Sequence, residues 1–84
     1  MKKRINKKMY DTEKAAFLGY AYFGEYGQPD GFEEQLFVTE DGQHFIFGIG
    51  GLESPYQNPT IKLFTPEQAS EWKNSEGVNC VEQQ

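Results

Sequence analysis

The chain has 84 residues, of which 37% are hydrophobic and 25% are charged, and its formal net charge is −5. This length suits one small hydrophobic core, and no apolar run approaches the roughly 20 residues that a membrane span needs. The single cysteine, Cys80, excludes an internal disulfide and favours a cytoplasmic protein. The basic N-terminus lacks a following apolar run, so we do not expect a secretory signal peptide.

Positive charge is concentrated at the N-terminus. Residues 1–8 carry +5 and residues 9–84 carry −10, which together give the net −5. An acidic body repels the phosphates of nucleic acids and suits a basic protein partner. Asn6-Lys7 predicts a tight turn between two short extended pieces within residues 4–10. We interpret residues 1–8 as a basic arm.

The next segment predicts a helix followed by a strand. Asp11 precedes residues 12–18, where an acidic side chain in the first turn and two alanines favour a short helix. Residues 20–23 are rich in aromatic side chains, which favour a strand. Alternation along that strand would place Tyr20 and Tyr22 on one face.

The clearest predicted element is a β-hairpin formed by residues 32–39 and 44–49, after a glycine- and proline-containing loop. Asp-Gly at positions 41 and 42, between two aromatic and β-branched runs, is among the strongest short-range hairpin signals. Residues 48–51 are rich in glycine but lack the Lys-Ser/Thr ending of a phosphate-binding loop. They therefore indicate a sharp exit from the strand with close backbone approach.

The C-terminal third predicts a short strand at residues 60–64 and a helix at residues 66–74. Thr65 as a cap, a proline at the first helical position and Gln68 three residues after the cap form a capping-box pattern. The residues expected on the buried side of this helix are Ala69 and Trp72.

These elements together predict an α+β fold in the order β-α-β-β-β-β-α, with an antiparallel sheet of three or four strands backed by two short helices. We expect a single domain over residues 1–77, including the basic arm 1–8. Residues 78–84 are predicted to be a flexible C-terminal tail.

No residue pattern specifies a reaction. His44 is the only histidine and lies directly after the hairpin turn, near Glu40 and Asp41, but no positioned nucleophile accompanies it. Histidine, cysteine and carboxylates do not occur at metal-ligand spacings. We therefore predict a protein without catalytic activity, cofactor or metal.

Acidic and tyrosine side chains of the central strands are the candidate partner-binding residues. Adjacent strand residues point to opposite faces, so neither acidic pair has the spacing of a catalytic dyad. A solvated surface is the plainer interpretation of the carboxylates, and the acidic surroundings of the tyrosines favour a protein partner over stacked bases. The candidate residues are Glu33, Glu34, Glu40, Asp41, Tyr20 and Tyr22.

The basic arm supports an alternative hypothesis, in which the protein binds DNA or RNA through phosphate contacts. A solubilising role is the simpler interpretation of such an arm, so direct nucleic-acid binding is the weaker hypothesis. An exposed edge strand of the sheet could also pair with a second copy across a two-fold axis. The candidate nucleic-acid-binding residues are Lys2, Lys3, Arg4, Lys7 and Lys8.

Three separated motifs resemble a family of small uncharacterised proteins from phages and integrative mobile elements of Gram-positive bacteria. The family's Tyr-Asp-Thr-Glu-x-Ala opening, Gly-Gly-x-x-Ser-x-Tyr segment and Thr-x-Glu-x-Ala-x-x-Trp helix are matched by residues 10–15, 50–56 and 65–72. Phe37 departs from a tyrosine that is usual in the family. The resemblance implies a mobile-element origin. It also suggests an inhibitor of a host nucleic-acid-handling factor with a basic surface, such as an anti-CRISPR protein or another defence inhibitor.

Overall fold

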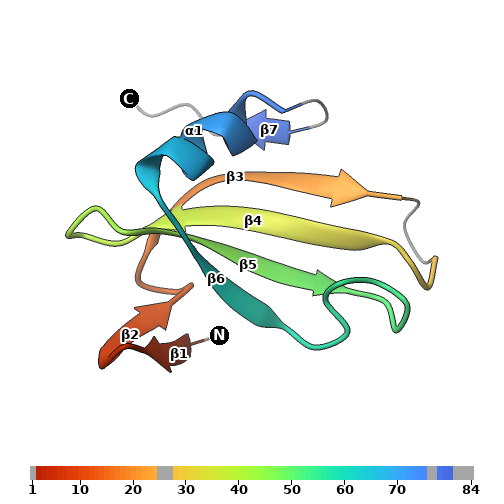
Figure 1. The fold of residues 1–84 in the computed structure, drawn as a ribbon, viewed down its shortest axis with the longest axis horizontal. Helices are drawn as coiled ribbons and strands as arrows, with labels where there is room; N and C mark the ends of the chain where they lie inside the picture. The colour runs from red at the N-terminus through yellow and green to blue at the C-terminus, as the bar shows by residue number, and fades with distance from the viewer. Residues whose placement is uncertain (1, 25–27, 76–77, 81–84) are drawn as a thin grey trace.

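The computed structural model describes residues 2–24, 28–75 and 78–80 (Figure 1). Its strands form two antiparallel sheets: a two-stranded hairpin, β1-β2, and a five-stranded sheet in the order β6-β5-β4-β3-β7. The predicted α+β class is confirmed, with one helix in the described residues. The elements in chain order are β1 (Lys2–Ile5), β2 (Lys8–Asp11), β3 (Ala16–Phe23), β4 (Phe32–Val38), β5 (His44–Gly50), β6 (Thr60–Phe64), α1 (Pro66–Lys73) and β7 (Val78–Cys80).

The basic N-terminal residues form a hairpin rather than an arm. β1 pairs with β2 through the predicted turn, in which Asn6 (φ 51°) and Lys7 (φ 67°) both adopt the left-handed conformation. Two left-handed residues match the right-handed twist of the flanking strands, which explains the tight connection. Tyr10 is 4% exposed and packs its ring edge-on to Phe45, with 5.6 Å between centroids. This contact anchors the hairpin on the larger sheet.

The helix expected over residues 12–18 does not form. The backbone N–H groups of Lys14 and Ala15 donate to the Asp11 carbonyl at 3.2 and 3.0 Å, and the N–H of Glu13 donates to Asp11 Oδ1 at 2.9 Å. Asp11 thus caps a single turn, as its position predicted, but β3 begins at Ala16. Pairing of β3 with β4 and burial of its apolar side chains outweigh the weak helical preference of a short segment.

An irregularity in β3 decides which side chains share a face. The register with β4 shifts between Phe17 and Gly19, so that Phe17 and Tyr20 stack on the same side with 6.4 Å between their ring centroids. Leu18 is buried on the opposite side. Such a bulge places one extra residue opposite a single partner and changes the alternation of the strand. It brings Phe17 next to the two tyrosines of β3.

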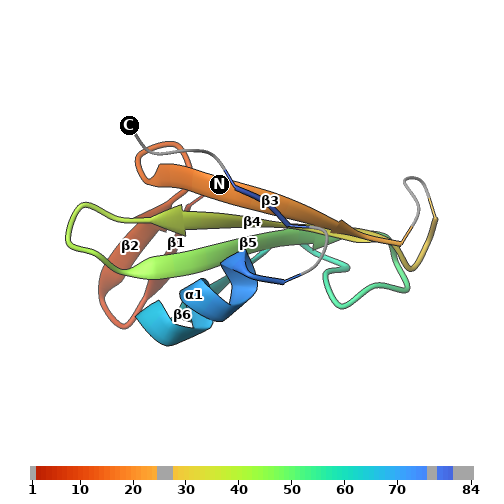
Figure 2. The same cartoon turned by 90° about the horizontal axis from the view of Figure 1, so that it is seen from above.

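One face of the five-stranded sheet, called here the helix face, is covered by α1 (Figure 2). The predicted capping box is present: Gln68 N–H donates to Thr65 Oγ1 at 3.1 Å, and Thr65 N–H donates to Gln68 Oε1 at 2.9 Å. Ala69 and Trp72 are buried against the sheet, as predicted. Their core partners on this face are Leu18, Ala21, Leu36 and Ile46.

Residues 78–80 form β7, which corrects the expectation of a flexible tail for this segment. β7 pairs with β3, with Val78 opposite Ala21 and Cys80 opposite Gly19. Val78 also packs against the core of the helix face. Strand addition satisfies backbone groups of β3 that would otherwise form an open edge. The rest of the predicted tail, residues 81–84, lies outside the described residues.

The glycine-rich exit from β5 has the structural role that its composition indicates. A Cβ at Gly48 would lie 2.3 Å from Cε1 of Tyr56, whose ring is 2% exposed. Only glycine allows the loop after β5 to fold back over the strand at this distance. Among the described residues, no helix is long and apolar enough to cross a membrane.

Candidate protein-interaction surface

The second face of the five-stranded sheet, called here the hairpin face, carries its own core. Phe37 and Phe45 stack with 5.3 Å between centroids, and Tyr10 of the hairpin covers them. Phe37 is 5% exposed, so the residue that departs from the resembled family contributes to packing. The hairpin thus covers the end of this face that adjoins the β4–β5 turn (Figure 1).

Glu34 does not belong to an accessible acidic patch. It lies on the helix face, where Trp72 Nε1 donates to Glu34 Oε1 at 3.0 Å and the Tyr56 hydroxyl donates to Glu34 Oε2. Burial, followed by the hydrogen bond to Glu34, raises the pKa of Tyr56 and keeps its hydroxyl protonated. Glu34 therefore lies on the opposite face from Glu33, where its carboxylate joins α1 to the loop after β5.

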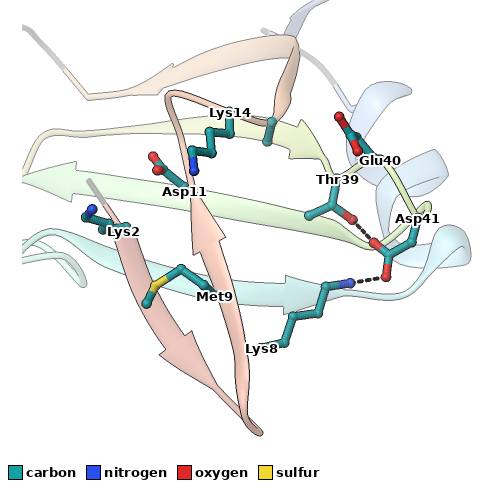
Figure 3. A pocket seen from close by; sticks show the side chains of 9 residues that line it. Lys2, Lys8, Met9, Asp11, Lys14, Thr39, Glu40 and Asp41 are labelled. Carbon is teal, nitrogen blue, oxygen red and sulfur yellow. Dashed lines mark hydrogen bonds and ion pairs between the residues drawn. The ribbon is translucent and has the colours of Figure 1, made fainter.

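Glu40 and Asp41 lie in the β4–β5 turn, at the opposite end of β4 from Glu33. Asp41 pairs with Lys8 of the hairpin and also accepts a hydrogen bond from the Thr39 hydroxyl (Figure 3). These contacts, led by the hydrogen bond from Lys8, hold the pKa of Asp41 below its usual value. Asp41 therefore ties the N-terminal hairpin to the turn, and the four predicted carboxylates do not form one patch.

A hollow of about 490 Å³ separates the hairpin from the β4–β5 turn (Figure 3). Its lining carries both signs of charge, with Lys2, Lys14 and the carboxylate of Asp11 on one side and Glu40 on the other (Figure 3). The internal pair of Lys8 with Asp41 already neutralises one charge of each sign. This mixed lining does not favour either an anion or a cation.

Tyr22 and Ile49 expose apolar surface on the part of the hairpin face that the hairpin leaves uncovered. They lie on either side of Glu33 in one row across three strands, because Tyr22 pairs with Glu33 and Glu33 pairs with Ile49. Tyr22 is 51% exposed and Ile49 is 41% exposed. We call this surface the open half; it consists of Tyr20, Tyr22, Glu33, Gln35, Phe47 and Ile49.

A continuous series of ring contacts joins the open half to the buried core. Tyr22 packs against Tyr20 with 6.0 Å between centroids, Tyr20 stacks on Phe17, and Phe17 meets Phe37 at 5.5 Å. The predicted placement of both tyrosines on one face is confirmed. Rings held by their neighbours lose little conformational freedom on binding, which suits an interface.

Glu33 supplies the carboxylate of the open half. Its Oε2 accepts a hydrogen bond from Gln35 Nε2 at 2.9 Å, which holds the carboxylate along the strand between the two exposed apolar side chains. Sequence reasoning selected Glu33, Tyr20 and Tyr22 together, and the structure brings these three to one face. It missed Ile49, although the alternation of Phe45, Phe47 and Ile49 along β5 could have placed Ile49 on the same face of the sheet.

A second hollow of about 430 Å³ borders the open half at the loop end of the sheet. Tyr22, Glu33 and Ile49 line it together with the loops that follow β3 and β5. Backbone hydrogen bonds join these loops: Gly51 N–H donates to the Gly31 carbonyl at 3.0 Å, and Glu53 N–H donates to the Pro29 carbonyl at 2.9 Å. The rim of this hollow is therefore braced by main-chain contacts.

His44 lies on the helix face, where it pairs with Val38 of β4 and Phe64 of β6. Its Nδ1 atom is buried without a hydrogen-bond partner, while Asp41 directs its carboxylate to Lys8 and Thr39. Burial, followed by the nearby charge of Lys73, lowers the pKa of His44. In the described part of the chain, no group of three histidine, cysteine or carboxylate side chains could hold a metal ion.

The predicted nucleic-acid-binding residues all lie on the N-terminal hairpin. Lys2, Lys3, Arg4 and Lys7 are exposed, whereas Lys8 is engaged with Asp41.

No protein-family model, no curated protein and no solved structure matches the chain. The open half is therefore interpreted from its own residues.

Proposed function

We propose that this protein is a non-catalytic binding module that docks on a protein partner through the open half. The observation that carries the proposal is the row Tyr22–Glu33–Ile49, in which two well-exposed apolar side chains flank a carboxylate. Tyrosine is enriched at the centres of protein interfaces, and clustered apolar exposure commonly marks an interaction site. The bordering hollow offers a place for one side chain of the partner.

The charge of the chain favours a basic partner surface. The net charge is −5, and Asp30 and Glu53 are exposed in the loops next to the open half. A field of this sign accelerates encounter with basic proteins and opposes encounter with nucleic acid. We expect the affinity for the partner to fall as salt is added, because exposed charges are screened within about 8 Å at physiological ionic strength.

A host nucleic-acid-handling factor is the partner class that we favour. Such proteins present basic channels to phosphate backbones, and an acidic module can occupy them in place of the nucleic acid. The mobile-element setting comes from the resemblance of the three sequence motifs. An RNA-guided defence nuclease, whose guide–target duplex lies in a positively charged channel, is the leading example of this class.

Binding of DNA or RNA through the N-terminal hairpin remains the alternative. The observation that favours it is the placement of Lys2, Lys3, Arg4 and Lys7 as exposed cations on one ordered hairpin. Deleting residues 1–8 would remove the whole of β1 and expose Tyr10, so truncation would confuse unfolding with loss of contacts. Replacing Lys3 and Arg4 by glutamine is the cleaner test, and a mobility-shift assay would detect the loss.

Site-specific photo-crosslinking tests the proposed function. A photoreactive amino acid placed at position 22 would report on the open half, and the same group at the exposed position 71 of α1 is the matched control. We expect position 22 to give an adduct with a protein other than this chain, which survives nuclease treatment and is absent from position 71. Equal adducts from both positions, or adducts that vanish with nuclease, would contradict the proposal.

A further inference from the structure

We infer that a second copy of this chain can occupy the open half, with its β1–β2 hairpin laid over Tyr22, Glu33 and Ile49. The inference rests on the proposed function, because it concerns the same surface, the open half, and assigns to it a partner and a means of regulation. It extends that function, because the free protein would then cover its docking surface by self-association.

The outer side of the hairpin has the apolar component that this pairing needs. Tyr10 faces the sheet core and Ile5 packs with it, so the alternating residues Arg4 and Met9 lie on the other side of the hairpin, where Met9 also borders the first hollow. Arg4 and Met9 lie directly opposite each other in the hairpin, and Met9 is 48% exposed. An exposed methionine is an adaptable side chain that packs favourably against aromatic rings.

The charges of the two surfaces are complementary. The outer side of the hairpin presents the exposed cations Lys2 and Arg4 beside Met9, together with one carboxylate, that of Asp11 opposite Lys2. The open half presents Glu33 between Tyr22 and Ile49. In the proposed pair, Met9 and the net positive side of the hairpin therefore face two apolar side chains that flank a carboxylate. The two cations belong to residues 1–8, which carry +5, and Glu33 belongs to the remainder of the chain, which carries −10.

Two-fold symmetry allows both contacts to form at once. In each copy, the hairpin covers one part of the hairpin face and leaves the open half beside it, so both surfaces lie on the same side of the sheet. An isologous pair would place the hairpin of each copy over the open half of the other. The contact between Arg4 and Glu33 would then occur twice, and the pair would close without further growth.

Sedimentation velocity on the purified protein, over a range of protein and salt concentrations, tests this inference. We expect a dimer at low salt that weakens with added salt. Glu33→Lys and Arg4→Glu should each weaken the dimer by at least about tenfold, since like charges would meet twice. Glu71→Lys, which makes the same charge change on α1, should leave dimerisation near that of the wild type. Circular dichroism would verify that every variant is folded.

Mixing the two weakened variants tests directly whether Arg4 of one copy contacts Glu33 of the other. In a mixed pair, Arg4 of one copy meets Glu33 of the other, and the substituted glutamate meets the substituted lysine. We therefore expect an equimolar mixture of Glu33→Lys and Arg4→Glu to dimerise like the wild type. A monomer at all concentrations, a dimer indifferent to both substitutions, or a mixture that stays monomeric would overturn the inference. A dimer formed through an edge strand would be indifferent to both substitutions, so it would also overturn the inference.

Failure of this inference is distinguishable from failure of the proposed function. If the protein is a monomer but position 22 still forms a specific adduct with another protein, the dimer inference is overturned and the proposed function stands. A dimer with the expected charge dependence, in a protein that gives adducts only with itself, would support the second copy and contradict docking on a host protein.

Discussion

Trp72 donates a hydrogen bond from Nε1 to Oε1 of Glu34 across 3.0 Å, between residues 38 positions apart in the sequence. Tyr56 donates to the other oxygen of the same carboxylate. Glu34 therefore joins helix α1, strand β4 and the loop that crosses Gly48. The carboxylate satisfies two donors that would otherwise be buried without partners, which makes it part of the framework beneath the open half.

Replacing Glu34 by alanine should destabilise the fold. The substitution leaves the indole N–H and the Tyr56 hydroxyl without an acceptor, and hydrogen bonds to charged groups contribute about 1.5–3 kcal/mol. We expect Glu34→Ala to lower the free energy of unfolding by roughly 2–3 kcal/mol in urea denaturation. Glu33→Ala is the matched control on the same strand, and it should cost less than about 1 kcal/mol. Equal losses in the two variants would contradict the assigned role of Glu34.

Gly48→Ala should be strongly destabilising because the new methyl group would lie 2.3 Å from the Tyr56 ring. Overpacking of this kind costs typically 1–3 kcal/mol. A double-mutant cycle with Tyr56→Ala measures the clash, since removing the ring should make the methyl group tolerable. Additive effects of the two substitutions in urea denaturation would show that the ring is not the obstacle.

Lys7→Gly should stabilise the N-terminal hairpin. Lys7 adopts φ 67°, a left-handed conformation that costs an ordinary residue about 1 kcal/mol and costs glycine little. Asn-Gly is also the preferred pair for this turn type. We expect a gain of roughly 0.5–1 kcal/mol in the free energy of unfolding. Lys7→Ala, which removes the charge and retains the strain, should give no such gain.

Protonation of His44 should weaken the fold as the solution becomes acidic. Its pKa is lowered in the folded protein, chiefly by burial, so the unfolded chain binds the proton more readily. The stability contributed by neutral His44 is therefore complete above the unfolded pKa and is lost as pH falls through the folded pKa. Thermal melts between about pH 7 and pH 5 should show a larger loss in the wild type than in His44→Gln. Parallel curves for the two proteins would contradict this assignment.

Local signals account for the parts of the fold that the sequence predicted. The capping box at Thr65 and the Asp-Gly turn at positions 41 and 42 each determine an element from neighbouring residues, and both are present. Residues 12–18 and 78–80 were assigned wrongly because their conformations depend on pairing across the sheet. β7 is only three residues long and becomes a strand through its contact with β3.

The same distinction applies to the candidate surface. Tyr20, Tyr22 and Glu33 were predicted because strand alternation relates nearby residues, and they lie together on the open half. The contacts of Glu34 could not be predicted, because Tyr56 and Trp72 lie 22 and 38 residues away in the sequence. The extent of the open half follows from where the N-terminal hairpin packs, which no local pattern specifies.

The most direct test of the account is the affinity of the purified cross-linked partner for two matched variants. The double variant Tyr22→Ala/Ile49→Ala removes the exposed apolar side chains of the open half. Leu52→Ala removes an apolar side chain that is 79% exposed but lies in the loop after β5. We expect titration calorimetry to show at least a tenfold loss for the double variant, about 1.4 kcal/mol, and wild-type affinity for Leu52→Ala. Wild-type affinity in the double variant would contradict docking through the open half.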